Sequence, residues 1–160
     1  MNRKLLLGSG IFLVLGLVVL GLWWMQSGPG QQEGPSIPVE LMGAKNLGSL
    51  QVELAYDPAV LEATEVKAGE LAKNAMVEYN LAAPGLLVVG VIDAAGIGGN
   101  GSVVTVSFKV LDKAGTSPIT LERIEANDAT TLIDIPVRAS AGSFVARDQL
   151  VTAPVISLSP

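Results

Sequence analysis

The stretch that decides the fold is SLQVELAYDP, residues 49–58. Apolar side chains alternate in it with polar or small ones, in the order Ser49, Leu50, Gln51, Val52, Glu53, Leu54, Ala55 and Tyr56. Because successive side chains of a strand point to opposite faces, this alternation predicts a strand with one buried and one exposed face. Asp57-Pro58 ends the strand, since proline fixes φ and keeps the residue before it out of the helical region.

The same period of two recurs along the chain after residue 37, and turn residues interrupt it every few positions. This pattern is typical of the short strands of a β-sandwich. Pro84-Gly85 predicts the turn of a hairpin, and the Gly-rich residues 94–102 predict a loop. Between 59 and 73 the periodicity is mixed, and we expect a strand, a turn and a short helical piece. We expect about nine strands in all. One lies within residues 59–73, and the others are residues 38–42, 49–56, 76–81, 86–92, 103–111, 119–125, 131–139 and 143–146.

The composition indicates a single folded domain. Of the 160 residues, 49% are hydrophobic and 16% are charged, so the chain is too apolar and too weakly charged to be disordered. Aromatic residues make up only 4%, which means that Val, Leu, Ile and Ala must build the core. We therefore expect an all-β sandwich.

The chain contains neither Cys nor His, which excludes disulfides, thiolate or imidazole metal sites and most nucleophile and acid-base systems. A carboxylate pair could support glycoside hydrolysis, but no acidic residue stands in a recognisable catalytic setting. The motif GIGGNG, residues 96–101, precedes a strand rather than the helix N-terminus that a phosphate site requires. We expect a non-catalytic domain without a cofactor or a metal site.

The expected domain is acidic. Of the charged residues, Arg3 and Lys4 lie before residue 26, so the chain after residue 25 carries the other 8 basic residues and all 15 acidic ones, a net charge of −7. No basic run or basic-aromatic stripe occurs in the sequence. Nucleic acid is therefore not an expected partner, because its binding depends on neutralising phosphates.

The N-terminal residues 5–25, LLLGSGIFLVLGLVVLGLWWM, carry no charge. A helix of this length spans roughly 31 Å, about one hydrocarbon core, so residues 1–27 are expected to anchor the chain in a membrane by a single pass. Arg3 and Lys4 precede the segment and the next basic residue is Lys45. The positive-inside rule therefore places the following domain on the extracytoplasmic, extracellular side.

A cleaved secretory signal is the alternative for this segment, since it shares the basic start and the apolar run. In that case the domain would be secreted, so both interpretations place it outside the cell. Residues 28–36 are rich in Gly, Pro, Gln and Ser, a composition typical of a short flexible tether. The domain is expected to cover residues 37–160.

Three stretches in this order and spacing resemble the cohesin domain: LMGAKNLGSLQVELAYDPAVLEATEV (41–66), GLLVVGVIDAAGIGGNGSVVTVSFKV (85–110) and ATTLIDIPVRASAGSF (129–144). The sharpest element is the corner Tyr56-Asp57-Pro58, followed by Val60-Leu61-Glu62. The resemblance implies a sandwich of nine strands with jelly-roll topology. It also implies a function: binding a dockerin, a small helical module on another protein that carries its own calcium.

The resemblance further implies which residues contact the partner. By position they are Ser49, Gln51, Tyr79, Gly90, Ile92, Asp93 and Leu132. The alternation in residues 49–56 independently turns Ser49 and Gln51 away from the core.

This chain departs from the family pattern in two places. Cellulosomal cohesins often carry Asn and Asp where Ser49 and Gln51 stand, and Gly90 removes an apolar anchor, so the partner is expected to differ from a standard dockerin. The strand that usually precedes residues 37–42 is also missing, which leaves a strand edge open. We expect the C-terminal tail, residues 149–157, to occupy that place, with Pro154 restricting it to an edge or a bulge.

A domain of another class remains open as an alternative, either a carbohydrate-binding module for a polysaccharide or a structural or adhesion sandwich. Exposed aromatic rings usually meet sugar surfaces. Beyond the apolar segment the aromatic residues are Tyr56, Tyr79, Phe108 and Phe144. Alternation predicts that three of these four are buried, so protein binding is the favoured function.

Overall fold

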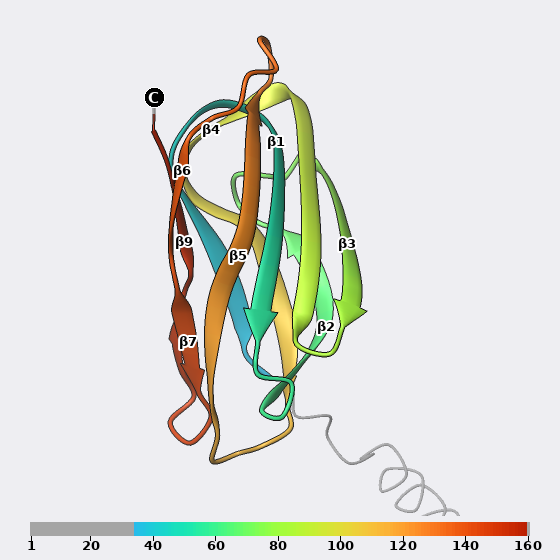
Figure 1. Cartoon of the computed structure of the whole chain (residues 1–160), viewed down its shortest axis with the longest axis vertical. Helices are drawn as coiled ribbons and strands as arrows, with labels where there is room; N and C mark the ends of the chain where they lie inside the picture. The colour runs from blue at the N-terminus through green and yellow to red at the C-terminus, as the bar shows by residue number, and fades with distance from the viewer. Residues whose placement is uncertain (1–33, 160) are drawn as a thin grey trace, which may run out of the picture. The chain divides into compact units, whose positions relative to one another are not determined.

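The computed structural model describes residues 34–159, and the expected anchor and most of the tether lie outside this range. The described residues form one compact unit of nine β-strands without a helix (Figure 1). None of them forms a helix that could cross a membrane. The strands are β1 (Ser36–Tyr56), β2 (Leu61–Ala68), β3 (Met76–Ala83), β4 (Leu86–Val110), β5 (Thr116–Asp128), β6 (Val137–Ser140), β7 (Gly142–Val145), β8 (Leu150–Thr152) and β9 (Val155–Leu158).

Two long strands, β1 and β4, form the frame of the fold and pair with each other in antiparallel fashion along most of their length. Each bends in its middle, where the register shifts between Leu41 and Ser49 of β1. The second half of β1 lies with the first half of β4 in a layer that also contains β3 and β5. The other halves lie with β2 and β9. One hydrogen-bonded sheet thus folds into the two layers of a sandwich.

The bend corrects two sequence predictions. Residues 38–42 and 49–56 are the ends of the single strand β1, and residues 94–102 are not a loop but part of β4, where Ile97 pairs with Leu47. Gly96, Gly99 and Gly101 have positive φ, a conformation that glycine adopts without strain. The ladder can therefore continue through bulges while its direction changes.

The core lies between the two layers and is mainly aliphatic, as predicted. Tyr56, at the end of β1, packs edge-on against Phe108 of β4 with ring centroids 5.1 Å apart, which joins the layers. The expected corner after Tyr56 is confirmed: the Asp57 backbone N–H donates to the Ser117 hydroxyl at 2.9 Å, and Oδ1 of Asp57 accepts from the Ala59 N–H at 2.9 Å.

Two further segments differ from the prediction. Residues 59–73 contain the expected strand, β2, but a turn at 71–74 stands where a short helical piece was expected. Residues 131–136 form a loop rather than a strand, and β6 begins only at Val137. Pro136 lacks a backbone N–H and so cannot donate to a ladder. The count of nine strands is reached because the C-terminal tail supplies two strands.

That tail covers the edge of β1, as the sequence predicted. Strand β9 runs parallel to β1, with Ile156 opposite Leu41, and antiparallel to β6 on its other side. The preceding strand β8 pairs with β7. Pro154 lies between β8 and β9, where its missing N–H interrupts neither ladder, and its carbonyl accepts from the Glu40 N–H at 3.0 Å.

Candidate protein-binding face

One side of the sandwich presents the outer surface of β3, β4, β1 and β5, which lie side by side toward the viewer in Figure 1. Residues opposite each other in neighbouring strands point to the same face, so the register defines three rows. We name this surface the four-strand face. Its rows are Met76, Ile92, Ser49 and Asn127; Glu78, Gly90, Gln51 and Glu125; and Asn80, Val88, Glu53 and Arg123.

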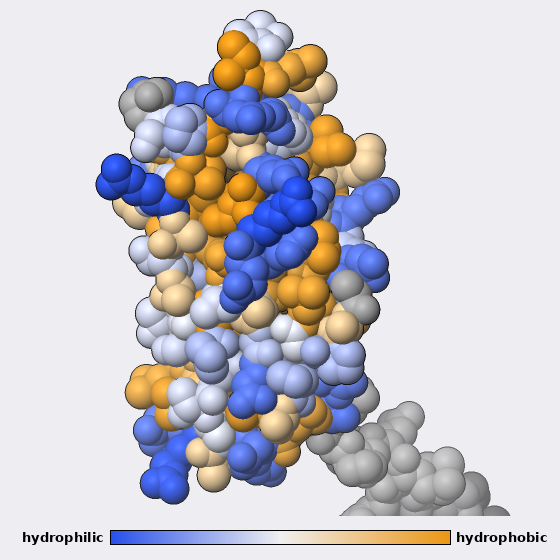
Figure 2. Space-filling model, viewed as in Figure 1, coloured by the Kyte–Doolittle hydropathy of each residue, from blue (hydrophilic) through white to orange (hydrophobic). Residues whose placement is uncertain are grey.

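Four of the predicted contact residues come together on this face. Ser49 lies opposite Ile92, and Gln51 lies opposite Gly90. Ile92 is 55% exposed although it is apolar, while the Ser49 hydroxyl donates to Oδ1 of Asn127 at 3.2 Å. Figure 2 shows hydrophobic areas on this side, separated by a band of hydrophilic residues. The face therefore offers both apolar surface and hydrogen-bonding groups.

The centre of the face is hollowed at Gly90. A Cβ atom placed on Gly90 would meet no other atom within 4 Å. The hollow measures about 170 Å³. Its lining consists of Ser49, Leu50, Gln51, Gly90, Val91, Ile92, Glu125 and Asn127.

The structure does not bring Tyr79 and Asp93 into these rows. Tyr79 of β3 pairs with Val89 of β4, which is buried, so the Tyr79 side chain leaves β3 on the core side. It is nevertheless 43% exposed, because β3 lies at the edge of the sheet. Asp93 follows Ile92 along β4, and its Oδ1 accepts from the Ala95 N–H at 2.9 Å. The carboxylate of Asp93 is thus bonded to the backbone of its own strand, β4.

Leu132 lies in a loop that projects from the end of the sandwich between β5 and β6 (Figure 1), and it is 75% exposed with a φ of 58°. Asp128 holds this loop, because its Oδ1 accepts from the backbone N–H groups of Thr130 and Thr131, each at 2.8 Å. These bonds from Thr131 and Thr130, followed by one from Asn46, lower the pKa of Asp128 to about 2. The ionised carboxylate keeps Leu132 presented to solvent.

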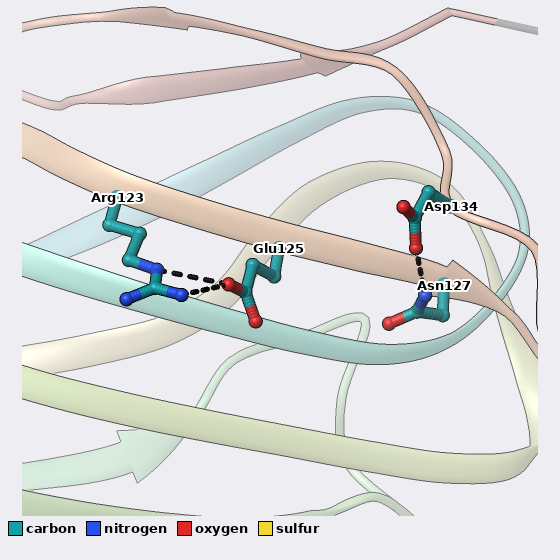
Figure 3. A network of polar contacts seen from close by, with 4 residues as sticks. All are labelled: Arg123, Glu125, Asn127 and Asp134. Atoms are coloured by element: carbon teal, nitrogen blue, oxygen red, sulfur yellow. Dashed lines mark hydrogen bonds and ion pairs between the residues drawn. The ribbon is translucent and has the colours of Figure 1, made fainter.

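The base of the loop is joined to the four-strand face. Asn127 of β5 donates from Nδ2 to Oδ1 of Asp134 at 2.7 Å (Figure 3), and the two residues also form a β-bridge. Because Asn127 shares a row with Ser49, the first row continues toward the loop that carries Leu132. Leu132 therefore lies beyond the end of the face rather than within it.

Sequence reasoning missed the charged residues of the face. Glu53, Glu78, Arg123 and Glu125 all stand in its rows, and Nε of Arg123 donates to Glu125 at 2.9 Å (Figure 3). This hydrogen bond and the charge of Glu125, followed by that of Glu53, raise the pKa of Arg123. The polar positions of the predicted strands 76–81 and 119–125 were the available signal, but only the register shows that they adjoin Gln51 and Gly90.

A family model matches the chain over residues 34–146, and it is the model of the cohesin domain. The chain belongs to the cohesin family. Cohesin domains are non-catalytic binding modules, so the family and the absence of an enzymatic role are as the sequence predicted. This cohesin has no match among curated proteins.

Solved cohesin structures resemble this one. The non-cellulosomal cohesin from the hyperthermophilic archaeon Archaeoglobus fulgidus is 26% identical, with a TM-score of 0.54 over 79% of this chain and 81% of that one. The sixth cohesin of scaffoldin B from Acetivibrio cellulolyticus, solved in complex with a Cel5 dockerin mutant, is 19% identical, with a TM-score of 0.55 over 79% and 88%. A type II cohesin from the same organism is 21% identical, with a TM-score of 0.57 over 72% and 86%. The last two support the fold alone, and all three agree with an all-β cohesin fold.

Proposed function

We propose that this cohesin binds a dockerin-bearing protein through its four-strand face, and that residues 5–25 hold the complex at the outer side of a membrane. The observation that carries the first half is the meeting of Ser49, Gln51, Gly90 and Ile92 on one open sheet face. Cohesins of the same fold from Acetivibrio cellulolyticus and Clostridium thermocellum have been solved with dockerins. Calcium would be carried by the dockerin.

The character of the face supports a protein partner. An exposed apolar residue, Ile92, lies beside hydrogen-bonding and charged side chains, a mixture that suits a specific but reversible interface. A sugar-binding surface is less well supported. Tyr79 is the exposed aromatic residue between residues 34 and 159, and it leaves its strand on the other side.

The membrane half of the proposal rests on the sequence. Residues 5–25 are uncharged and long enough to cross a bilayer once. If this segment is cleaved, the domain would be secreted and would bind its partner away from the cell. Fractionation of producing cells distinguishes an uncleaved anchor from a cleaved signal. An uncleaved anchor keeps the domain in the membrane fraction, where external protease can reach it, whereas cleavage releases the domain into the medium.

A pull-down tests the binding function. Residues 31–160 serve as bait, since the core residues of the part that the structure describes lie between Ile37 and Leu158, and calcium-loaded dockerins from the same proteome serve as prey. We expect at least one dockerin to bind. The variant Ile92→Asp should abolish retention, whereas Glu65→Gln, on β2 in the other layer, should leave it unchanged. If no dockerin is retained by the unaltered bait, the proposed function is wrong.

A further inference from the structure

The hollow over Gly90 lies at the centre of the four-strand face, and its size and lining specify what can fill it. We propose that it receives one basic side chain of the partner, a lysine or an arginine. This inference rests on the proposed function and adds the chemistry of the partner's contact surface.

The space is that of a single side chain. Val88 and Ile92, the neighbours of Gly90 on the same face of β4, both carry side chains, so the gap between them is one residue wide. The hollow measures about 170 Å³, and a cavity of roughly 150 Å³ holds a benzene ring. A partner side chain of moderate size can therefore enter without moving the sheet.

The walls of the hollow differ in polarity. Ile92 is an apolar wall on one side, and Gln51 and Glu125 bring an amide and a carboxylate to the other. Lysine and arginine combine an aliphatic stem with a charged end. The stem can lie over Gly90 against Ile92 while the charged end reaches the polar side.

The charge of the face favours a cation. Glu78, on β3, and Glu125, on β5, share a row with Gly90, and Glu53 stands in the next row. Arg123 is the basic residue of the three rows and already pairs with Glu125. Three carboxylates against one guanidinium leave an excess of two negative charges on this face.

In the other layer of the sandwich, acidic side chains are paired with lysines. Lys67 pairs with Glu65, and Lys109 pairs with Glu62, across or along β2 and β4. Between residues 34 and 159 neither Glu53 nor Glu78 forms a salt bridge. An apolar side chain seated at Gly90 would dehydrate nearby carboxylates without compensation, which is unfavourable, whereas a cation would pair with them.

Gly90→Val tests the hollow with little risk to the fold. Gly90 does not have a positive φ, and its added Cβ would meet nothing within 4 Å, while valine is favoured in strands. Gly98→Val is the matched control, since its Cβ would make only an ordinary contact of 3.7 Å with the Ala44 carbonyl at the bend of β4. Both variants should melt no lower than the unaltered protein.

Binding is measured by calorimetry with the full chain in detergent micelles and the dockerin that the pull-down retains. We expect Gly90→Val to weaken binding by about tenfold or more, as for a hot-spot residue, and Gly98→Val to leave it unchanged. Equal binding by Gly90→Val would overturn this inference while leaving the proposed function intact. Failure of the unaltered protein to bind would overturn both.

The charge of the occupant is tested with the double variant Glu78→Gln, Glu125→Gln. A basic occupant predicts weaker binding and a smaller loss of affinity when salt rises from about 0.05 to 0.5 M, where screening becomes strong. Replacing the partner's contacting lysine or arginine by methionine should have the same effect on the unaltered cohesin and little effect on the double variant. If binding and its salt dependence are the same in the double variant, the occupant is not basic and the inference is wrong.

Discussion

The C-terminal tail offers the sharpest test of the fold, because a point substitution in it should destabilise the whole domain. Ile156 of β9 is fully buried, with β1 on one side and β6 on the other. Leu158, two residues on, is also buried in the same core. Strand β9 thus contributes two side chains to the core and pairs with the otherwise open edge of β1.

The size of the effect follows from this burial. Replacing a fully buried isoleucine by alanine costs about 2–5 kcal/mol, from lost transfer free energy and from the cavity left behind. For a domain of this size, 1 kcal/mol lowers the melting temperature by about 4 °C. Ile156→Ala should therefore lower it by about 8–20 °C. A chain ending at Arg147 loses both β8 and β9 and should melt at least as low.

The measurement is a thermal melt of residues 31–160 followed by circular dichroism. Leu150→Ala is the control, since Leu150 lies in the neighbouring strand β8 but is 61% exposed. An exposed substitution changes stability by less than about 0.5 kcal/mol, or about 2 °C here. If the chain ending at Arg147 melts within that margin of the unaltered protein, the tail is not part of the core and our reasoning is wrong.

The remaining predictions concern the corner after β1 and the projecting loop. Ser117→Ala should lower the free energy of unfolding by about 1–3 kcal/mol in urea titrations, because it removes the buried Ser117 hydroxyl and leaves the partly buried Asp57 N–H without its acceptor; an unchanged midpoint would contradict this. The pKa of Asp128 is lowered to about 2, so its stabilising effect is complete above its ordinary value of 3.8 and is lost as the pH falls toward about 2. The protection of the Thr130 and Thr131 amides, measured as their exchange rates relative to unstructured amides at the same pH, should fall over that range, and Asp128→Asn should remove the pH dependence of this protection; a loop equally protected at both ends of the range would count against the role of Asp128.

Much of the fold was predictable because it depends on local pattern. Alternation in residues 49–56 identified a strand with Ser49 and Gln51 outside, and proline and the aspartate before it identified the corner. The failures occurred where local signals favour one structure and long-range pairing imposes another. The glycines of residues 94–102 are typical of a loop, but pairing with β1 keeps them in a strand, since Gly99 and Ile97 of β4 still lie opposite Ala44 and Leu47 of β1 between the bulges.

The four-strand face likewise contains residues that the sequence predicted and residues that only strand pairing reveals. Ser49, Gln51, Gly90 and Ile92 were predicted together and lie together, whereas the Tyr79 side chain leaves β3 on the core side, which the residues of β3 alone do not indicate because they do not give its phase against β4. A shift by one residue exchanges the two faces of a strand. The charged residues Glu78 and Glu125 were overlooked for the same reason.

The sequence by itself thus determined that this protein is an acidic, non-catalytic all-β cohesin with a polar side to its central strand. Only the tertiary structure decided which strands are neighbours, in what register, and where the tail is paired. Period-two alternation is a property of adjacent residues and says which face a side chain takes within its own strand. The position of Gly90 opposite Gln51, with Glu78 and Glu125 on either side, depends on pairing between distant segments, which the burial of the shared core and the bends of β1 and β4 determine.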